Sequence, residues 1–195
     1  MKRKIHNPVF LALILLSIII FGLIATAYSE EVPLIPLRDF FRNPEKSGYS
    51  ISPNGEYFAF LAPWETRLNI FVQKIGENEA NRITSITDRD LTAYFWANNK
   101  RIVYIRDQAG EENFHLYAVD IDGTNRVDLT PFEGVRSGVI DILKNNDQEM
   151  IISLNRRDPR FFDAYRMNID TGEMKRIAEN PGNIVSWLTD HNGLL

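Results

Sequence analysis

The longest apolar run of the chain lies near its N-terminus. Residues 9–25 read VFLALILLSIIIFGLIA, seventeen positions without a charge, and they follow the basic residues 2–4 (KRK). A basic start, an apolar stretch and small residues at 25–29 are typical of a secretory signal, while a run of this length also approaches what a helix needs to cross a bilayer. The pattern therefore predicts a signal peptide or an N-terminal membrane anchor over residues 1–29. Both alternatives export the rest of the chain, to the periplasm or the outside of the cell.

A short segment of different character follows. Residues 30–47 read EEVPLIPLRDFFRNPEKS, in which Pro33 and Pro36 favour extended backbone. Leu37–Phe41 is expected to form a short helical turn. We interpret this stretch as a lead-in segment and not as a domain.

From residue 48 onward the apolar and polar positions repeat. Each unit holds a turn rich in Asn, Asp and Gly, a short apolar strand, a polar loop, an alternating strand, a second turn and a third strand. The matching apolar strands are Tyr57–Leu61, Ile102–Arg106 and Ile151–Asn155, offset by about 44 to 49 residues. A further strand in each unit is expected at Gly48–Ile51, Thr92–Trp96, Gly138–Leu143 and Ile184–Leu188.

This period predicts an all-β chain built from four-stranded propeller blades. We expect a partial β-propeller over residues 48–195, with blades at about 48–84, 92–130 and 138–178 and the start of a fourth at about 184. The turns support hairpins, because Asn54-Gly55, Asp122-Gly123 and Thr171-Gly172 supply the residues that tolerate positive φ.

The strand at 114–121 has two faces with different side chains. Phe114, Leu116 and Ala118 point one way, while Tyr117 and Val119 point the other, so we expect the second blade to lie between two neighbours. The following residues are predicted to be largely buried: Phe58, Phe60, Ile102, Tyr104, Leu116 and Ile151.

The charge of the chain restricts its partners. Without residues 1–29 there remain 19 basic and 26 acidic residues, a formal net charge of −7. Nucleic-acid binding requires clustered Lys and Arg, so we expect no nucleic acid partner. The chain also has no cysteine, so its stability must come from packing and not from disulfides.

Several segments together resemble a known family. IPLRDFF (35–41), YSISPNGEYFAF (49–60), FHLYAVD (114–120), LNRRDP (154–159) and NPGNIVSWLTDH (180–191) are similar, in this order, to segments of prolyl oligopeptidase-type (S9) serine peptidases. The likeness is to their acylaminoacyl-peptidase and dipeptidyl-peptidase branches. The turn at Ser52–Glu56 alone is less specific, because TolB-type periplasmic propellers use the same repeat.

The resemblance implies a propeller that gates and positions peptides for a C-terminal α/β-hydrolase domain with a Ser-Asp-His triad. The nucleophile motif G-x-S-x-G does not occur in these 195 residues, so no residue of this chain is assigned a catalytic role. The implied partners are that hydrolase domain and peptide substrates. The alternative is a TolB-like periplasmic propeller that serves as a binding scaffold without catalysis.

Two polar groups are candidate substrate-binding sites. Arg156, Arg157 and Arg160 lie in one polar loop, and guanidinium groups bind carboxylates, including the end of a peptide. A loop that only pairs these residues with nearby Asp side chains is the other interpretation. Glu111 and Glu112 precede a strand, and paired carboxylates in the propellers of dipeptidyl-peptidase relatives hold a substrate amino terminus; a solvated acidic loop is the alternative.

We expect neither a metal nor a cofactor. The segment Asp120–Asn125 begins like a calcium loop, but the position of the bidentate Glu in an EF-hand is occupied by Pro131. A hairpin turn is therefore predicted there.

Overall fold

The computed structural model describes residues 8–25, 33–42, 44–108 and 110–195. The chain divides into two compact units, Met1–Asn43 and Pro44–Leu195. The first holds helix α1 (Pro8–Ala25) and the one-turn helix α2 (Leu37–Phe40). The short helical turn expected in the lead-in segment is thus confirmed.

Helix α1 spans the apolar run of the sequence. Among the described helices, none is both long and apolar enough to cross a membrane. The basic residues 2–4 and the small residues 26–29 lie outside the described residues. The export signal therefore stays a prediction.

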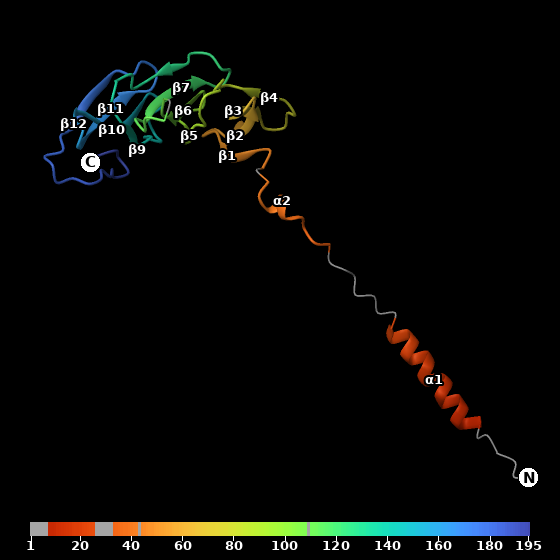
Figure 1. Ribbon diagram of the computed structural model, residues 1–195. Coiled ribbons are helices and arrows are strands. Elements are labelled where there is room, and N and C mark those ends of the chain that lie inside the picture. Colours follow the sequence, from red (N-terminus) through yellow and green to blue (C-terminus); the bar gives the residue numbers. More distant parts are fainter. Residues whose placement is uncertain (1–7, 26–32, 43, 109) are drawn as a thin grey trace, which may run out of the picture. The chain divides into compact units, whose positions relative to one another are not determined.

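The second unit is built from three four-stranded antiparallel sheets, each ordered as the chain runs (Figure 1). The first contains β1 (Ser47–Ile51), β2 (Tyr57–Trp64), β3 (Arg67–Lys74) and β4 (Ala80–Arg82). The second contains β5 (Ala93–Trp96), β6 (Arg101–Arg106), β7 (His115–Asp120) and β8 (Val127–Asp128). The third contains β9 (Ser137–Asp141), β10 (Glu149–Asp158), β11 (Phe161–Asn168) and β12 (Met174–Ala178). The predicted fold class, a partial propeller of four-stranded blades, is confirmed.

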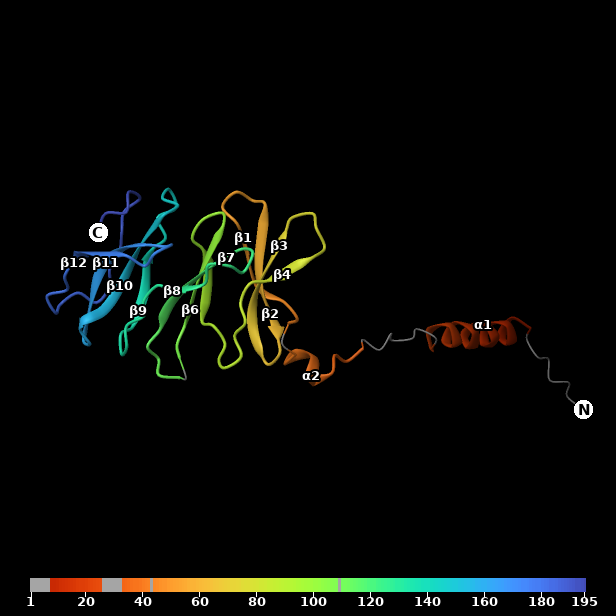
Figure 2. The same ribbon diagram turned by 90° about the horizontal axis from the view of Figure 1, so that it is seen from above.

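The three sheets follow one another in chain order, and the second lies between the other two (Figure 2). One apolar cluster joins the first and second sheets through Ala59, Ile70, Ile102 and Val119. Another joins the second and third sheets, with Val103, Leu116, Ile152 and Met167 among its members. Alternation along β6 and β7 sends successive side chains to opposite clusters, which confirms the expected two-faced strand.

Two glycine turns bring neighbouring sheets into close contact. Gly123 and Gly172 have φ of +85° and +74°, in the left-handed region that favours glycine. A Cβ at Gly172 would lie 3.2 Å from the carbonyl oxygen of Leu129, and one at Gly123 would lie 3.7 Å from the Cα of Ile83. Each turn therefore sits against the end of the preceding sheet's last strand, at the same place in the repeat.

Five of the six residues predicted to be largely buried are at most 3% exposed, and Phe58 is the exception. Phe58 is half-buried. Its ring lies beside those of Tyr49 and Phe60, with ring centroids 5.8 and 5.9 Å away.

The segment after β12 differs from the expectation. Residues 184–188 form no strand, because no described segment pairs with their backbone. They lie along the third sheet instead, where the Trp187 indole N–H donates a hydrogen bond to the carbonyl oxygen of Phe162 at 2.8 Å. The expected first strand of a fourth blade is therefore absent from the described structure.

Candidate functional site

All five candidate residues lie at one end of the sheets, where the second strand of a sheet turns back into the third. We call this the hairpin end. Glu111 and Glu112 lie in the connection from β6 to β7, and Arg156, Arg157 and Arg160 lie at or beside the turn from β10 to β11. Antiparallel strands in the same order turn back at the same end of each sheet, so the repeat itself brings the two groups to one side of the molecule.

Arg157 is bound to a buried carboxylate. Its Nε and Nη2 donate hydrogen bonds to the two oxygens of Asp163 at 2.8 and 3.0 Å, and Nη2 also donates to the carbonyl oxygen of Asn180 at 2.8 Å. The Asp163 side chain is 0% exposed. Hydrogen bonding from Arg157 outweighs burial and holds the pKa of Asp163 below its usual range. Arg157 therefore braces the hairpin against the segment that follows β12.

Arg160 and Arg156 are both exposed, but their surroundings differ. Arg160 donates to Asp158 through Nε at 3.1 Å and Nη2 at 2.8 Å, and this pairing lowers the pKa of Asp158 to about 2. The Arg156 side chain makes no hydrogen bond or ion pair within the described part of the chain. Its guanidinium carbon lies 4.0 Å from the centre of the Phe132 ring. Of the three arginines, only Arg156 keeps all its donors free.

Glu111 and Glu112 are exposed, and their carboxylates have no ion-pair partner among the described residues. The backbone of Glu112, in contrast, is held on both sides. Its N–H donates to Asp107 at 3.2 Å and its carbonyl accepts from the Nε of Arg136 at 3.0 Å. The residue adopts φ +60°, a conformation that a non-glycine residue keeps only when its surroundings impose it.

Arg136 links the second and third sheets at this end and was not identified from the sequence. It pairs through its backbone with Asn155, next to Arg156, while its side chain reaches Glu112. The two predicted groups are therefore connected through one residue. No local sequence pattern distinguishes Arg136, because its role comes from the approach of two sheets.

A buried polar residue recurs at one position of the repeat, near the hairpin end of each third strand. These residues are Asn69, His115 and Asp163. Each binds a partner at or just after its sheet's fourth strand: Asn69 accepts from the Thr84 hydroxyl at 2.9 Å, and His115 Nδ1 lies 2.9 Å from Asp128. Asp163 accepts from the Asn180 N–H at 2.8 Å. Buried polar groups need such partners, so this position is structural.

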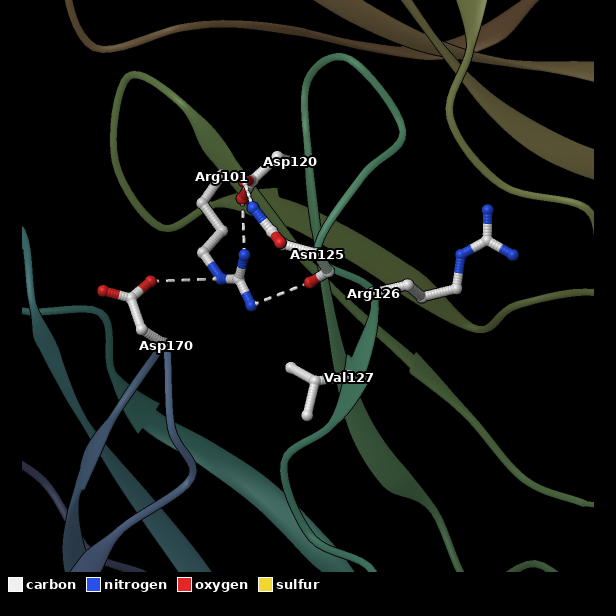
Figure 3. A pocket seen from close by; sticks show the side chains of 6 residues that line it. All are labelled: Arg101, Asp120, Asn125, Arg126, Val127 and Asp170. Atoms are coloured by element: carbon white, nitrogen blue, oxygen red, sulfur yellow. Dashed lines mark hydrogen bonds and ion pairs between the residues drawn. The ribbon is translucent and has the colours of Figure 1, made fainter.

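A cavity of about 350 Å³ lies near the opposite end, lined by Arg101, Asp120, Asn125, Arg126, Val127 and Asp170 (Figure 3). The Arg101 side chain is 5% exposed. It donates to Asp120 and to the carbonyl oxygen of Asn125 in its own sheet, and to the carbonyl oxygen of Ile169 in the third sheet at 3.0 Å. Because its charge is met by carboxylates and carbonyls of the protein, Arg101 acts as a clamp between two sheets.

A second cavity, of about 320 Å³, lies beside the third sheet at the hairpin end. It is lined by Arg160, Phe161, Phe162, Asn180, Gly182, Asn183, Ile184, Val185 and Trp187. Its walls come from β11 and from the irregular segment after β12, so its shape depends on how that segment lies.

Comparison with curated proteins gives two peptidase relatives. The chain is 28% identical to dipeptidyl aminopeptidase BIII of Pseudoxanthomonas mexicana over 95% of its own length and 28% of that protein's length. It is 26% identical to dipeptidyl peptidase family member 6 of Caenorhabditis elegans over 88% of its own length and 23% of the relative. The chain thus spans about a quarter of the curated relatives it matches. No protein-family model matches it.

Solved structures support the fold. The propeller domain of the trilobed protease from Pyrococcus furiosus matches 69% of this chain and 43% of its own, with a TM-score of 0.51 and 15% identity. The match to TolB from Acinetobacter baumannii covers 76% of this chain and 36% of TolB, with a TM-score of 0.50 and 18% identity. The match to an oligogalacturonate lyase covers 78% of this chain and 46% of the lyase, with a TM-score of 0.59 and 10% identity. Propellers with different activities match about equally well, so these structures show architecture and not activity.

Proposed function

We propose that this chain, which is a propeller fragment of a prolyl oligopeptidase-type (S9) serine peptidase, admits and positions peptides for an α/β-hydrolase domain encoded beyond Leu195. The observation that carries the proposal is the similarity to dipeptidyl aminopeptidase BIII over 95% of the chain. The hairpin end adds to it, because it exposes acidic and basic side chains that have no ion-pair partner within the described ranges of the chain.

In this proposal Glu111 and Glu112 bind the amino terminus of the peptide. A free ammonium group needs carboxylate acceptors, and these two carboxylates are exposed and without ion-pair partners among the described residues. The clamped backbone of Glu112 reduces the conformational freedom that binding would otherwise remove. Arg156 contacts the peptide directly, while Arg157 and Arg160 contribute through the turn that they brace against Asp163 and Asp158.

The first test is the reading frame beyond Leu195. We expect further blades followed by G-x-S-x-G and a late histidine. A continuation that closes the propeller and ends without the nucleophile motif would instead favour the second candidate, a non-catalytic TolB-like scaffold, which the structural similarity to TolB supports.

The second test uses the full-length protein and dipeptidyl reporter substrates. Glu112→Gln should raise KM for a substrate with a free amino terminus by about tenfold or more, because a charge-assisted contact is lost, and should leave KM for its acetylated counterpart unchanged. Glu173→Gln, an exposed residue of the β11–β12 turn, is the matched control. Equal effects of both substitutions on both substrates would refute the assigned role.

Export is the third part of the proposal and is supported by the basic start and apolar run of residues 1–25. Alkaline phosphatase fused after Ala62 should be active in a bacterial host, because that enzyme folds only outside the cytoplasm. Activity of a cytoplasmic reporter at the same junction, with an inactive phosphatase fusion, would contradict export.

A further inference from the structure

We propose that Arg156 and Arg136 form a carboxylate-binding site at the hairpin end, so that the full-length protein takes short peptides carrying a carboxylate. The inference rests on the proposed function and extends it, since it names the chemistry recognised at the other side of the site from Glu111 and Glu112.

One guanidinium of the arginine-rich turn has no hydrogen-bond or ion-pair partner among the described residues. Arg157 donates to Asp163 and Asn180, and Arg160 donates to Asp158. Arg156 is exposed and has no hydrogen-bond or ion-pair partner in the described part of the chain. In an acidic protein, a cation of this kind is a site for an anion from outside the chain.

The Phe132 ring fixes the orientation of Arg156. The guanidinium carbon lies 4.0 Å from the ring centre, within the range of a cation–π contact. Phe132 packs against the apolar cluster between the second and third sheets, so the ring itself is anchored. A guanidinium held by its face keeps its N–H groups free at the edge, in the forked arrangement that matches the two oxygens of a carboxylate.

Arg136, the residue just before β9, supplies a second cation. Its backbone N–H donates to the Asn155 side chain at 2.7 Å, and its carbonyl accepts the Asn155 N–H at 3.3 Å. Its side chain uses Nε for the carbonyl oxygen of Glu112, and its two terminal nitrogens have no hydrogen-bond partner in the part of the chain that the structure describes. Neither Arg136 nor Arg156 forms an ion pair with Glu111, Glu112 or Glu133, three acidic residues of the neighbouring loops, among the contacts of the described residues.

The arrangement favours a peptide with charges of both signs. Carboxylates at 111–112 and guanidiniums at 136 and 156 come from adjacent sheets and are joined by the Arg136–Glu112 hydrogen bond. On one short peptide, an ammonium group can bind the carboxylates and a carboxylate can bind the guanidinium groups. The carboxylate can come from the C-terminus of the peptide or from an acidic side chain, and the two sources are separable by experiment.

The test measures binding of three fluorescently labelled alanine peptides to the full-length protein by anisotropy. One ends in a free carboxylate, one in an amide, and one is an amide with a glutamate in place of an alanine. The wild-type protein should prefer at least one carboxylate peptide over the plain amide by about tenfold, as expected for a charge-assisted bidentate contact. The preferred peptide identifies the source of the carboxylate.

Arg156→Gln should abolish that preference, while Arg156→Lys should keep only part of it because the fork is lost. Phe132→Leu, which keeps an apolar side chain but removes the ring, should give an intermediate loss and covers the case in which the first variant is poorly folded. Arg166→Gln is the matched control, since Arg166 pairs with Glu149 on the same sheet away from the hairpin end.

Unchanged preference in both Arg156→Gln and Phe132→Leu would overturn the inference, as would equal binding of all three peptides to the wild-type protein. Hydrolysis of the peptides is measured separately. If peptides are cleaved without any carboxylate preference, only the inference fails. If no peptide is cleaved although the carboxylate preference depends on Arg156, the proposed peptidase function fails and the binding site stands.

Discussion

The two outermost sheet faces of the three-sheet unit are buried in different ways. The third sheet turns Ile151 away from the second sheet, and it is 0% exposed: the segment 180–195 reaches it at Gly193, where a Cβ would lie 3.8 Å from the Ile151 Cδ1. The first sheet turns Tyr49 and Ile51 away from the second sheet, and these are 59% and 64% exposed. One outer face therefore has a cover and the other does not.

The cover of the third sheet is attached at several points. Trp187 donates to the carbonyl oxygen of Phe162, and the Thr189 hydroxyl donates to Asp141 at 2.6 Å. Gly193 lies so close to Leu143 that a Cβ there would come within 2.5 Å of its side chain. These attachments are polar or backbone contacts, so an irregular segment can shield an apolar face without forming strands.

The first sheet buries part of its outer face with its own rings. Phe60 is 1% exposed although no other sheet covers it. Tyr49 and Phe71 stack on it with centroids 5.3 and 5.7 Å away, and the Lys46 ammonium lies 4.6 Å from its ring centre. Large aromatic side chains can shield one central residue, here Phe60. The side chain at the edge of the stack, Tyr49, stays largely in solvent. The comparison shows that a covering segment buries a face more completely than aromatic stacking does.

The largest effect is expected from Asp163→Ala, which removes the anchor of the covering segment. Arg157 and the Asn180 N–H would lose their acceptor in a buried position, and stability should fall by about 2–4 kcal/mol. Thermal or urea unfolding measures it. Asp158→Ala, which breaks the solvent-exposed pair with Arg160, should cost much less stability than Asp163→Ala. Equal losses for the two variants would show that burial of the carboxylate does not set the size of the effect.

Trp187→Ala tests the cover itself. The half-buried indole packs at the third sheet and bonds to Phe162, so its loss should cost about 2 kcal/mol and raise hydrogen exchange in β11. Val185→Ala, at a fully exposed position of the same segment, is the control and should be neutral. A neutral Trp187→Ala would mean that the segment contributes little to burial.

The pH dependence of stability should reflect Asp163. Its folded-state pKa is lowered by Arg157, so its contribution is full above the ordinary carboxyl pKa and is lost as pH falls through the lowered folded value. The stability difference between the wild-type protein and Asp163→Asn should therefore shrink as pH falls from about 5 toward about 2. Urea unfolding at several pH values measures this difference. If the stability difference stays constant with pH, the ion pair of Asp163 with Arg157 is not what stabilises the wild-type protein over the variant.

The smallest effect on stability is expected at the uncovered face. Ile51→Thr should change the free energy of unfolding by less than about 0.5 kcal/mol, because this side chain is 64% exposed; Tyr49 is left in place because it stacks on Phe60. Binding of a hydrophobic dye should decrease, since the apolar patch is reduced. A loss above about 1 kcal/mol would show that the Ile51 side chain is buried in solution.

Much of the fold follows from local patterns. The period of the apolar strands predicts the four-stranded units, and the Asn, Asp and Gly turns predict the hairpins because positive φ is a local requirement. The burial of Ile102 and Leu116 follows from alternation along their strands. Phe58 and residues 184–188 were predicted wrongly, because the sequence pattern of a strand does not reveal whether a neighbouring sheet or pairing partner is present.

The candidate site was predicted less completely. Sequence identified the loop with Arg156, Arg157 and Arg160, but these residues look equivalent along the chain. Only the fold separates Arg157, which is bound to Asp163, from Arg156, which is stacked on Phe132. Arg136 was missed because it acts across two sheets.

The sequence by itself thus determined the number, order and type of the sheets, because strand alternation and turn conformation depend on neighbouring residues. The tertiary structure alone decided which charges are free, since that depends on which carboxylates and rings arrive from other strands. The same holds for burial of the outer faces, because a face is buried only if a segment distant in sequence, here residues 180–195, folds across it.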